Sequence, residues 1–155
     1  MWKTGHSLIK AKMKEEHASM AGEMSGHMFF ADRYFGYDDA IYAACRLLEI
    51  VAHTPESLSE MLATIPPTFA TPEIRVQCDD DKKVSVVERV KTYFQSRQKV
   101  IDVDGARIVF PDGWGLVRAS NTQDILVLRF EALSQAGLDK IRSEVEDQVR
   151  LAMGL

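Results

Sequence analysis

The 155-residue sequence carries 19 Lys and Arg against 23 Asp and Glu, and its longest basic run is the pair Lys82-Lys83. This composition argues against nucleic acid and against anionic membranes as partners, because both require a concentrated basic face. Hydrophobic residues make up 46% of the chain, and it shows neither a membrane-length apolar run nor a secretory signal, so we expect a cytoplasmic globular protein.

Residues 6–16 predict a short basic helix at the start of the chain. His6 lies at its N-terminal end, where free backbone N–H groups and the helix dipole stabilise anions. A surface histidine without a role is the simpler interpretation of that position. Judged on this segment alone, the sequence leaves both interpretations open.

A loop between two short apolar runs gathers Glu23, Ser25 and His27. The apolar runs predict strands, and the intervening glycine permits a tight turn. A carboxylate beside a hydroxyl suits adjacent sugar hydroxyls, because a carboxylate can accept from two O–H donors at once. The alternative is metal binding by His6, Glu23 and His27. We favour the sugar interpretation, because nothing in the spacing fixes three ligands around one ion.

The first region ends with two helices and a proline-rich break. A long helix begins at the acidic pair Asp38-Asp39, which suits the first turn, and its broad apolar arc predicts packing against a sheet or between elements. A second helix over 57–64 begins with a capping-box pattern. Three prolines within 65–72 interrupt any helix or central strand. We therefore expect one domain over 1–64, a linker, and a second domain over 73–155.

The second domain shows the pattern of a self-contained α+β unit. Alternating apolar residues and two Asp-Gly turns predict strands, and two longer stretches have helical periodicity. The strands are expected within 74–78, 100–103, 106–110, 114–119 and 125–132, and the helices within 81–97 and 135–153. We expect an antiparallel sheet of about four strands with two helices on one face. The patterns therefore assign an α+β class to the C-terminal domain.

The loop Arg118-Ala-Ser-Asn-Thr122 lies between two of these predicted strands. A guanidinium, two hydroxyls and an amide within five residues are the groups that a phosphate monoester requires. The same residue types also occur in ordinary turns, so a merely polar loop is the alternative. We interpret Arg118, Ser120, Asn121 and Thr122 as phosphate-binding residues.

Three segments together resemble the C-terminal part of the α-D-phosphohexomutase superfamily, and most closely bacterial phosphomannomutase/phosphoglucomutase. They are Lys3-Thr-Gly-His-Ser7, Gly22-Glu-Met-Ser-Gly-His27 and Arg118-Ala-Ser-Asn-Thr122. The resemblance implies a four-domain enzyme that moves phosphate between the 1- and 6-positions of a hexose through hexose 1,6-bisphosphate, using a phosphoserine and Mg²⁺. It implies that 1–64 is the C-terminal part of the third domain, a partial α/β sugar-binding domain, and that 73–155 is the fourth, α+β domain. It also implies that Glu23 and Ser25 bind sugar hydroxyls and that His6 and His27 lie near the substrate. The loop at 118–122 would hold the phosphate that is not being transferred.

The departures from this family are as informative as the matches. The chain contains no Thr-Ala-Ser-His-Asn loop, which would carry the phosphoserine, and no Asp-Gly-Asp-x-Asp-Arg loop, which would hold Mg²⁺. We therefore expect neither a catalytic residue nor a metal ligand in this chain, which would be a mutase fragment that is inactive alone. A truncated first domain would expose apolar helix surface and promote self-association. A stand-alone phosphosugar-binding module that regulates a partner is the alternative.

Overall fold

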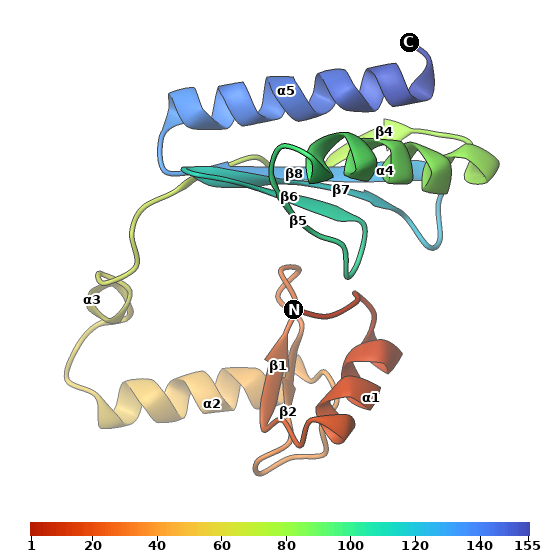
Figure 1. Cartoon of the computed structure of the whole chain (residues 1–155). Helices are drawn as coiled ribbons and strands as arrows, with labels where there is room; N and C mark the ends of the chain where they lie inside the picture. The colour runs from red at the N-terminus through yellow and green to blue at the C-terminus, as the bar shows by residue number, and fades with distance from the viewer. The chain divides into compact units, whose positions relative to one another are not determined.

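A computed structural model describes residues 1–155 (Figure 1). The chain divides into two compact units, Met1–Pro66 and Pro67–Leu155. The division lies inside the proline-rich stretch, where the helical pattern of the first region ends. None of the helices combines the length and the apolar character that crossing a membrane requires.

The first unit is built around a short hairpin. Its elements are α1 (His6–Glu15), β1 (Met20–Gly22), β2 (Met28–Phe30), α2 (Ala40–His53) and α3 (Leu58–Met61). The two strands pair antiparallel, with Gly22 opposite Met28. Phe29 is fully buried between the hairpin and α1, where it packs with Ile9 and Met13. This small core holds the start of α1 beside the turn that connects the two strands.

The apolar arc of α2 is present but uncovered. No residue of the helix is buried, and the side chains of Ile41 and Leu48 are 80% and 66% exposed. The contacts of the helix are mostly polar and aromatic: the Asp39 carboxylate accepts the N–H of Tyr42 at 2.9 Å, the Tyr42 ring meets Phe30, and Arg46 pairs with Asp32 at 2.8 Å. The predicted packing against a sheet is therefore missing in this unit, because its sheet has only two short strands.

The second unit is a sheet with two helices. Its elements are β3 (Phe69–Ala70), β4 (Ile74–Gln77), α4 (Asp80–Gln95), β5 (Lys99–Ile101), β6 (Ala106–Phe110), β7 (Gly113–Ala119), β8 (Ile125–Ala132) and α5 (Gln135–Met153). All pairings are antiparallel, in the order β3-β8-β7-β6-β5, and β4 also pairs with β8.

The predicted α+β class is confirmed, but the expected number of strands is wrong. The sheet has six strands instead of about four. Phe69–Ala70, inside the proline-rich stretch, pairs with the end of β8, while β4 pairs with the first half of the same strand. The stretch 65–72 therefore contributes to the sheet of the second unit as well as connecting the two units.

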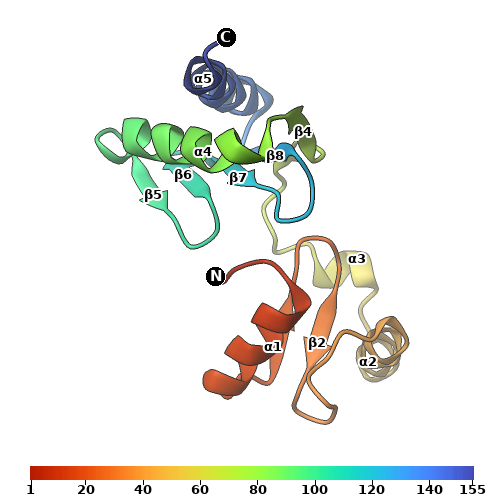
Figure 2. The same ribbon diagram turned by 90° about the vertical axis from the view of Figure 1, so that its right-hand side faces the viewer.

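Both helices of the second unit cover the same face of the sheet, as the apolar stripes predict (Figures 1 and 2). Phe94 from α4 and Val145 from α5 are fully buried against Ile108 and Leu126 of the sheet. Because strand residues alternate between faces, residues next to these buried positions point to the face that the helices leave open. Arg118 follows the buried Val117 and so belongs to the open face.

Candidate functional site

The loop after β7 is held in shape by its own backbone. The Ser120 N–H donates to the Ile125 carbonyl at 3.0 Å, which closes the loop immediately beyond the last residue pair of β7 and β8. The Ser120 Oγ accepts the N–H groups of Thr122 at 3.3 Å and Gln123 at 3.2 Å. Ser120 is buried, whereas Asn121 and Thr122 are exposed. The loop therefore presents two polar side chains to solvent on a preformed backbone.

Lys83 of α4 donates hydrogen bonds to the backbone of this loop. Its Nζ donates to the Ser120 carbonyl at 2.6 Å and to the Gln123 carbonyl at 3.1 Å, and it also forms an ion pair with Asp80. Only 7% of the residue is exposed, which is unusual for lysine. Two charge-assisted hydrogen bonds from one buried ammonium thus fix both ends of the loop.

Lys83 was not predicted as a site residue from the sequence, although its position on α4 carried a signal. The buried stripe of α4 includes Val87, Val90 and Phe94, and Lys83 lies one helical turn before Val87 on the same stripe. A lysine on an inward-facing stripe must find acceptors for its ammonium group. The carbonyl groups of the neighbouring loop meet that need.

Arg118 lies at the end of β7, beside the turn between β5 and β6. Its Nη1 is 3.5 Å from the Asp104 Oδ2, a long contact that leaves the other guanidinium N–H groups able to bind an anion. Gly105 in this turn has φ +83, and a Cβ there would meet the Val117 carbonyl and come within 2.6 Å of the Arg118 Cβ. Glycine is therefore required for the close approach that places Asp104 beside Arg118.

In the first unit, the structure brings His6, Glu23 and His27 together. The Glu23 Oε1 accepts the Gly5 N–H at 3.0 Å, and its Oε2 lies 3.8 Å from the His6 Nε2. The rings of His6 and His27 meet edge to face, with centroids 4.7 Å apart. Ser25 lies exposed in the turn between β1 and β2, next to this cluster in sequence.

Asp38 orients His27, a role that the sequence did not reveal. The Asp38 Oδ2 lies 2.7 Å from the His27 Nδ1, and its Oδ1 accepts the Met28 N–H at 3.1 Å. The hydrogen bond from His27 holds the pKa of Asp38 below its usual value. The acidic pair expected at the start of α2 therefore has divided roles: Asp39 caps the helix, and Asp38 contacts the hairpin.

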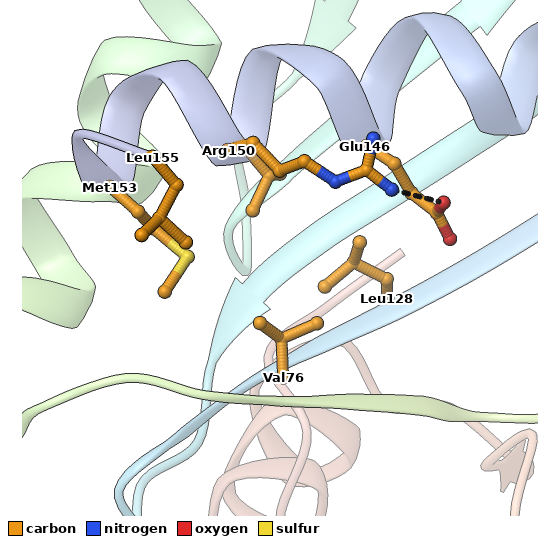
Figure 3. A pocket seen from close by; sticks show the side chains of 7 residues that line it. Val76, Leu128, Glu146, Arg150, Met153 and Leu155 are labelled. Atoms are coloured by element: carbon orange, nitrogen blue, oxygen red, sulfur yellow. Dashed lines mark ion pairs between the residues drawn. The ribbon is translucent and has the colours of Figure 1, made fainter.

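A pocket of about 270 Å³ in the second unit lies apart from the loop at 118–122 (Figure 3). It is formed by the end of α5 together with β4 and β8, and an ion pair of 3.5 Å between Arg150 and Glu146 is its main polar feature. Its lining residues are Val76, Leu128, Glu146, Val149, Arg150, Met153 and Leu155. None of the predicted binding residues borders this pocket.

Two family models match the chain in succession. The first, described as phosphoglucomutase/phosphomannomutase, alpha/beta/alpha domain III, matches residues 1–69. The second, described as phosphoglucomutase/phosphomannomutase, C-terminal domain, matches residues 73–148. The two matches meet within the proline-rich stretch.

Individual relatives give the same result. A phosphomannomutase/phosphoglucomutase of Pseudomonas syringae pv. tomato is 51% identical over 92% of this chain, and one from Pseudomonas aeruginosa is 46% identical over 97%. A solved structure of a phosphoglucomutase/phosphomannomutase family protein from Burkholderia thailandensis covers 98% of the chain at 43% identity, with a TM-score of 0.85. The chain spans 31% and 33% of the two Pseudomonas relatives and 32% of the solved chain.

Proposed function

Because the chain belongs to the phosphoglucomutase/phosphomannomutase family and matches its third and fourth domains in order, we propose that it is the substrate-binding C-terminal part of a phosphohexomutase. The complete enzyme would interconvert hexose 1-phosphate and hexose 6-phosphate through hexose 1,6-bisphosphate. The observation that carries this proposal is the loop at 118–122, whose polar residues are held in a fixed backbone shape by hydrogen bonds from Lys83 and within the loop.

The loop residues would hold the phosphate group that is not being transferred. Both lone pairs of the Ser120 hydroxyl are used by backbone N–H groups, so its proton remains available for a phosphate oxygen. Arg118 would contribute charge and paired N–H donors, and Asn121 and Thr122 would add an amide and a hydroxyl. Because the backbone is fixed before the ligand arrives, binding would cost little ordering of the loop.

The hairpin of the first unit would hold the sugar. We propose that the Glu23 carboxylate accepts hydrogen bonds from adjacent sugar hydroxyls and that the Ser25 hydroxyl exchanges hydrogen bonds with them. His6 and His27 would be further contacts. A mutase must accept its bisphosphorylated intermediate in two orientations. Fixed contacts are then best placed on the hydroxyls that both orientations share and on the distal phosphate, so that the reacting phosphate alone meets the catalytic groups.

The catalytic groups lie outside this chain in the proposal. The family chemistry implies a phosphoserine and Mg²⁺, which would supply the transferred phosphoryl group and neutralise its charge. The residues here do not fit Mg²⁺, because the three-residue cluster of possible ligands offers two imidazoles, whereas Mg²⁺ takes oxygen ligands. We therefore expect no turnover from the 155-residue chain. Turnover of glucose 1-phosphate by a pure sample, with Mg²⁺ and hexose bisphosphate added, would contradict this.

A cytoplasmic location fits the same proposal, because Cys45 and Cys78 are both free thiols and the proposed substrates are intracellular phosphosugars. The alternative of a stand-alone regulatory module is not supported, since the relatives that match most of the chain bear mutase names.

We propose that the exposed apolar face of α2 is an association surface. The family model for this region describes an alpha/beta/alpha domain, so the apolar face of α2 would be covered by a sheet that the rest of the domain supplies. Taken by itself, the 155-residue chain would cover that face with a second copy and self-associate.

The substrate-binding proposal can be tested by backbone amide shifts in the labelled chain. Titration with glucose 1-phosphate, mannose 1-phosphate or inorganic phosphate should each give saturable shifts at 118–122, and the two sugars should add shifts near Glu23 and Ser25. Arg118→Ala should abolish the loop shifts. Arg142→Ala is the matched control, because Arg142 is an exposed arginine of α5 that pairs with Glu146.

Two results would refute the proposal. One is the absence of saturable loop shifts at millimolar ligand. The other is binding that persists unchanged in Arg118→Ala, which would mean that the loop is merely polar.

A further inference from the structure

His6, Glu23 and His27 form a cluster with the geometry of an incomplete metal site. One possible ligand atom from each residue lies within 4.8 Å of the other two. In a tetrahedral zinc site, bonds of about 2.0–2.2 Å place neighbouring ligand atoms about 3.4 Å apart. To bind one zinc ion, the ligand atoms that are farthest apart must therefore approach each other by about 1.4 Å. The side chains of His6 and His27 are 52% and 45% exposed, so they can rotate without disturbing the core.

The residues behind the cluster already orient two of its three members. The His27 Nδ1 faces the Asp38 Oδ2 at 2.7 Å, and a carboxylate can only accept, so the ring proton lies on Nδ1 and Nε2 is left as the ligand atom. The Gly5 N–H binds the Glu23 Oε1, which leaves Oε2 directed toward His6. A histidine held by a carboxylate through its second nitrogen is the usual outer arrangement of a zinc ligand.

From this arrangement we propose that His6, Glu23 and His27 bind one divalent transition-metal ion, with Zn²⁺ the best match. Two imidazoles and one carboxylate form a three-ligand set that zinc uses when its fourth position stays open. Glu23 and the nearby Asp38 supply negative charge. The positive end of α1 opposes a cation there, but its Gly5 N–H is already bound by Glu23. Mg²⁺ should bind poorly, because two of the three donors are nitrogen.

Metal binding by this cluster does not depend on the function proposed above, but the effect of the bound ion on substrate binding rests on that function. If Glu23 also binds sugar hydroxyls, one carboxylate cannot serve the ion and the sugar fully at the same time. Zinc should then compete with the sugar part of the substrate while phosphate binding at 118–122 remains unchanged. The site would act as an inhibitory metal site in the sugar-binding hairpin.

The test is a titration of the untagged 155-residue chain with Co²⁺, followed by displacement with Zn²⁺. Tetrahedral Co²⁺ gives visible absorption bands, so the titration reports ligand geometry as well as affinity. We expect one ion per chain, displacement by Zn²⁺ and no displacement by Mg²⁺. His6→Gln and His27→Gln should each weaken Zn²⁺ binding by at least about 10-fold. Asp38→Asn should weaken it by about 10- to 100-fold.

His53→Gln is the matched control, because His53 is an exposed histidine at the end of α2 and contacts only the Glu49 carbonyl in its own helix. Its affinity should equal that of the wild type. Circular dichroism of each variant would establish that the unit remains folded. No saturable binding, or equal affinity in His27→Gln and His53→Gln, would overturn the proposal. Zinc binding in a chain that binds no phosphosugar would support the metal site and refute the function proposed above.

Discussion

Lys83 offers the sharpest test of how the phosphate loop is held. Replacing it in Lys83→Met keeps a side chain of similar length inside the α4 stripe but removes the ammonium group. The carbonyl groups of Ser120 and Gln123 would then lose their donor. We expect both a less stable second unit and a loop that binds phosphate weakly, although Lys83 contacts no ligand in the proposal.

The magnitude follows from the two hydrogen bonds. A hydrogen bond to a charged group contributes about 1.5–3 kcal/mol, and two are lost. Part of this loss is recovered, because a buried ammonium no longer has to be desolvated and the methionine side chain is apolar. A net loss of about 2 kcal/mol in the free energy of unfolding is the result. For a unit of fewer than 100 residues, that corresponds to a decrease in Tm of roughly 8–16 °C.

The assay combines thermal unfolding with hydrogen exchange. Lys83→Met should lower the Tm and speed exchange of the Ser120 and Cys78 amides, which bond to the Ile125 and Asp124 carbonyls where the loop joins β8. Lys82→Met is the matched control, because Lys82 directly precedes Lys83 in the sequence but is exposed, and its ammonium group pairs only with Asp79. Equal stability and equal phosphate affinity in the two variants would refute the reasoning.

Three further predictions concern other parts of the chain. Gly105→Ala should destabilise the second unit by at least about 1 kcal/mol in denaturant titrations and weaken phosphate binding, because a Cβ at φ +83 would push against Arg118. The pKa of Asp39 is lowered mainly by the hydrogen bond from the Tyr34 hydroxyl, so its stabilising effect is complete above about pH 4 and is lost as the pH falls through the lower folded value. The helical circular dichroism signal of the chain should therefore weaken as the pH is lowered through that range. The loss should be smaller in Asp39→Asn. Leu48→Glu should shift sedimentation toward the monomer; an unchanged concentration dependence would exclude the α2 face as the association surface.

Local sequence patterns were sufficient for the elements and for the general class of fold. The spacing of Val87, Val90 and Phe94 predicted α4, alternation predicted β8, and an Asp-Gly turn signal predicted β7. These periods follow from backbone geometry, which each residue carries with it. The expected placement of both helices on one face is confirmed, because α4 and α5 share one core with the sheet.

The strand count and the function of Lys83 were decided by tertiary structure. Phe69–Ala70 is too short and too close to prolines to have a strand pattern, and it pairs only because part of the β8 edge is free. Lys82 and Lys83 carry the same charge in adjacent positions. Only the packing of α4 against the loop buries Lys83 and leaves Lys82 exposed.

The sequence by itself named the residues of both candidate sites, because the chemistry of a guanidinium, a carboxylate or an imidazole belongs to the residue. It did not show that His6 reaches Glu23 and His27, or that Asp38 and not Asp39 orients His27. Those facts depend on where α1 and the hairpin pack around Phe29, and distance between residues remote in sequence is set by packing alone.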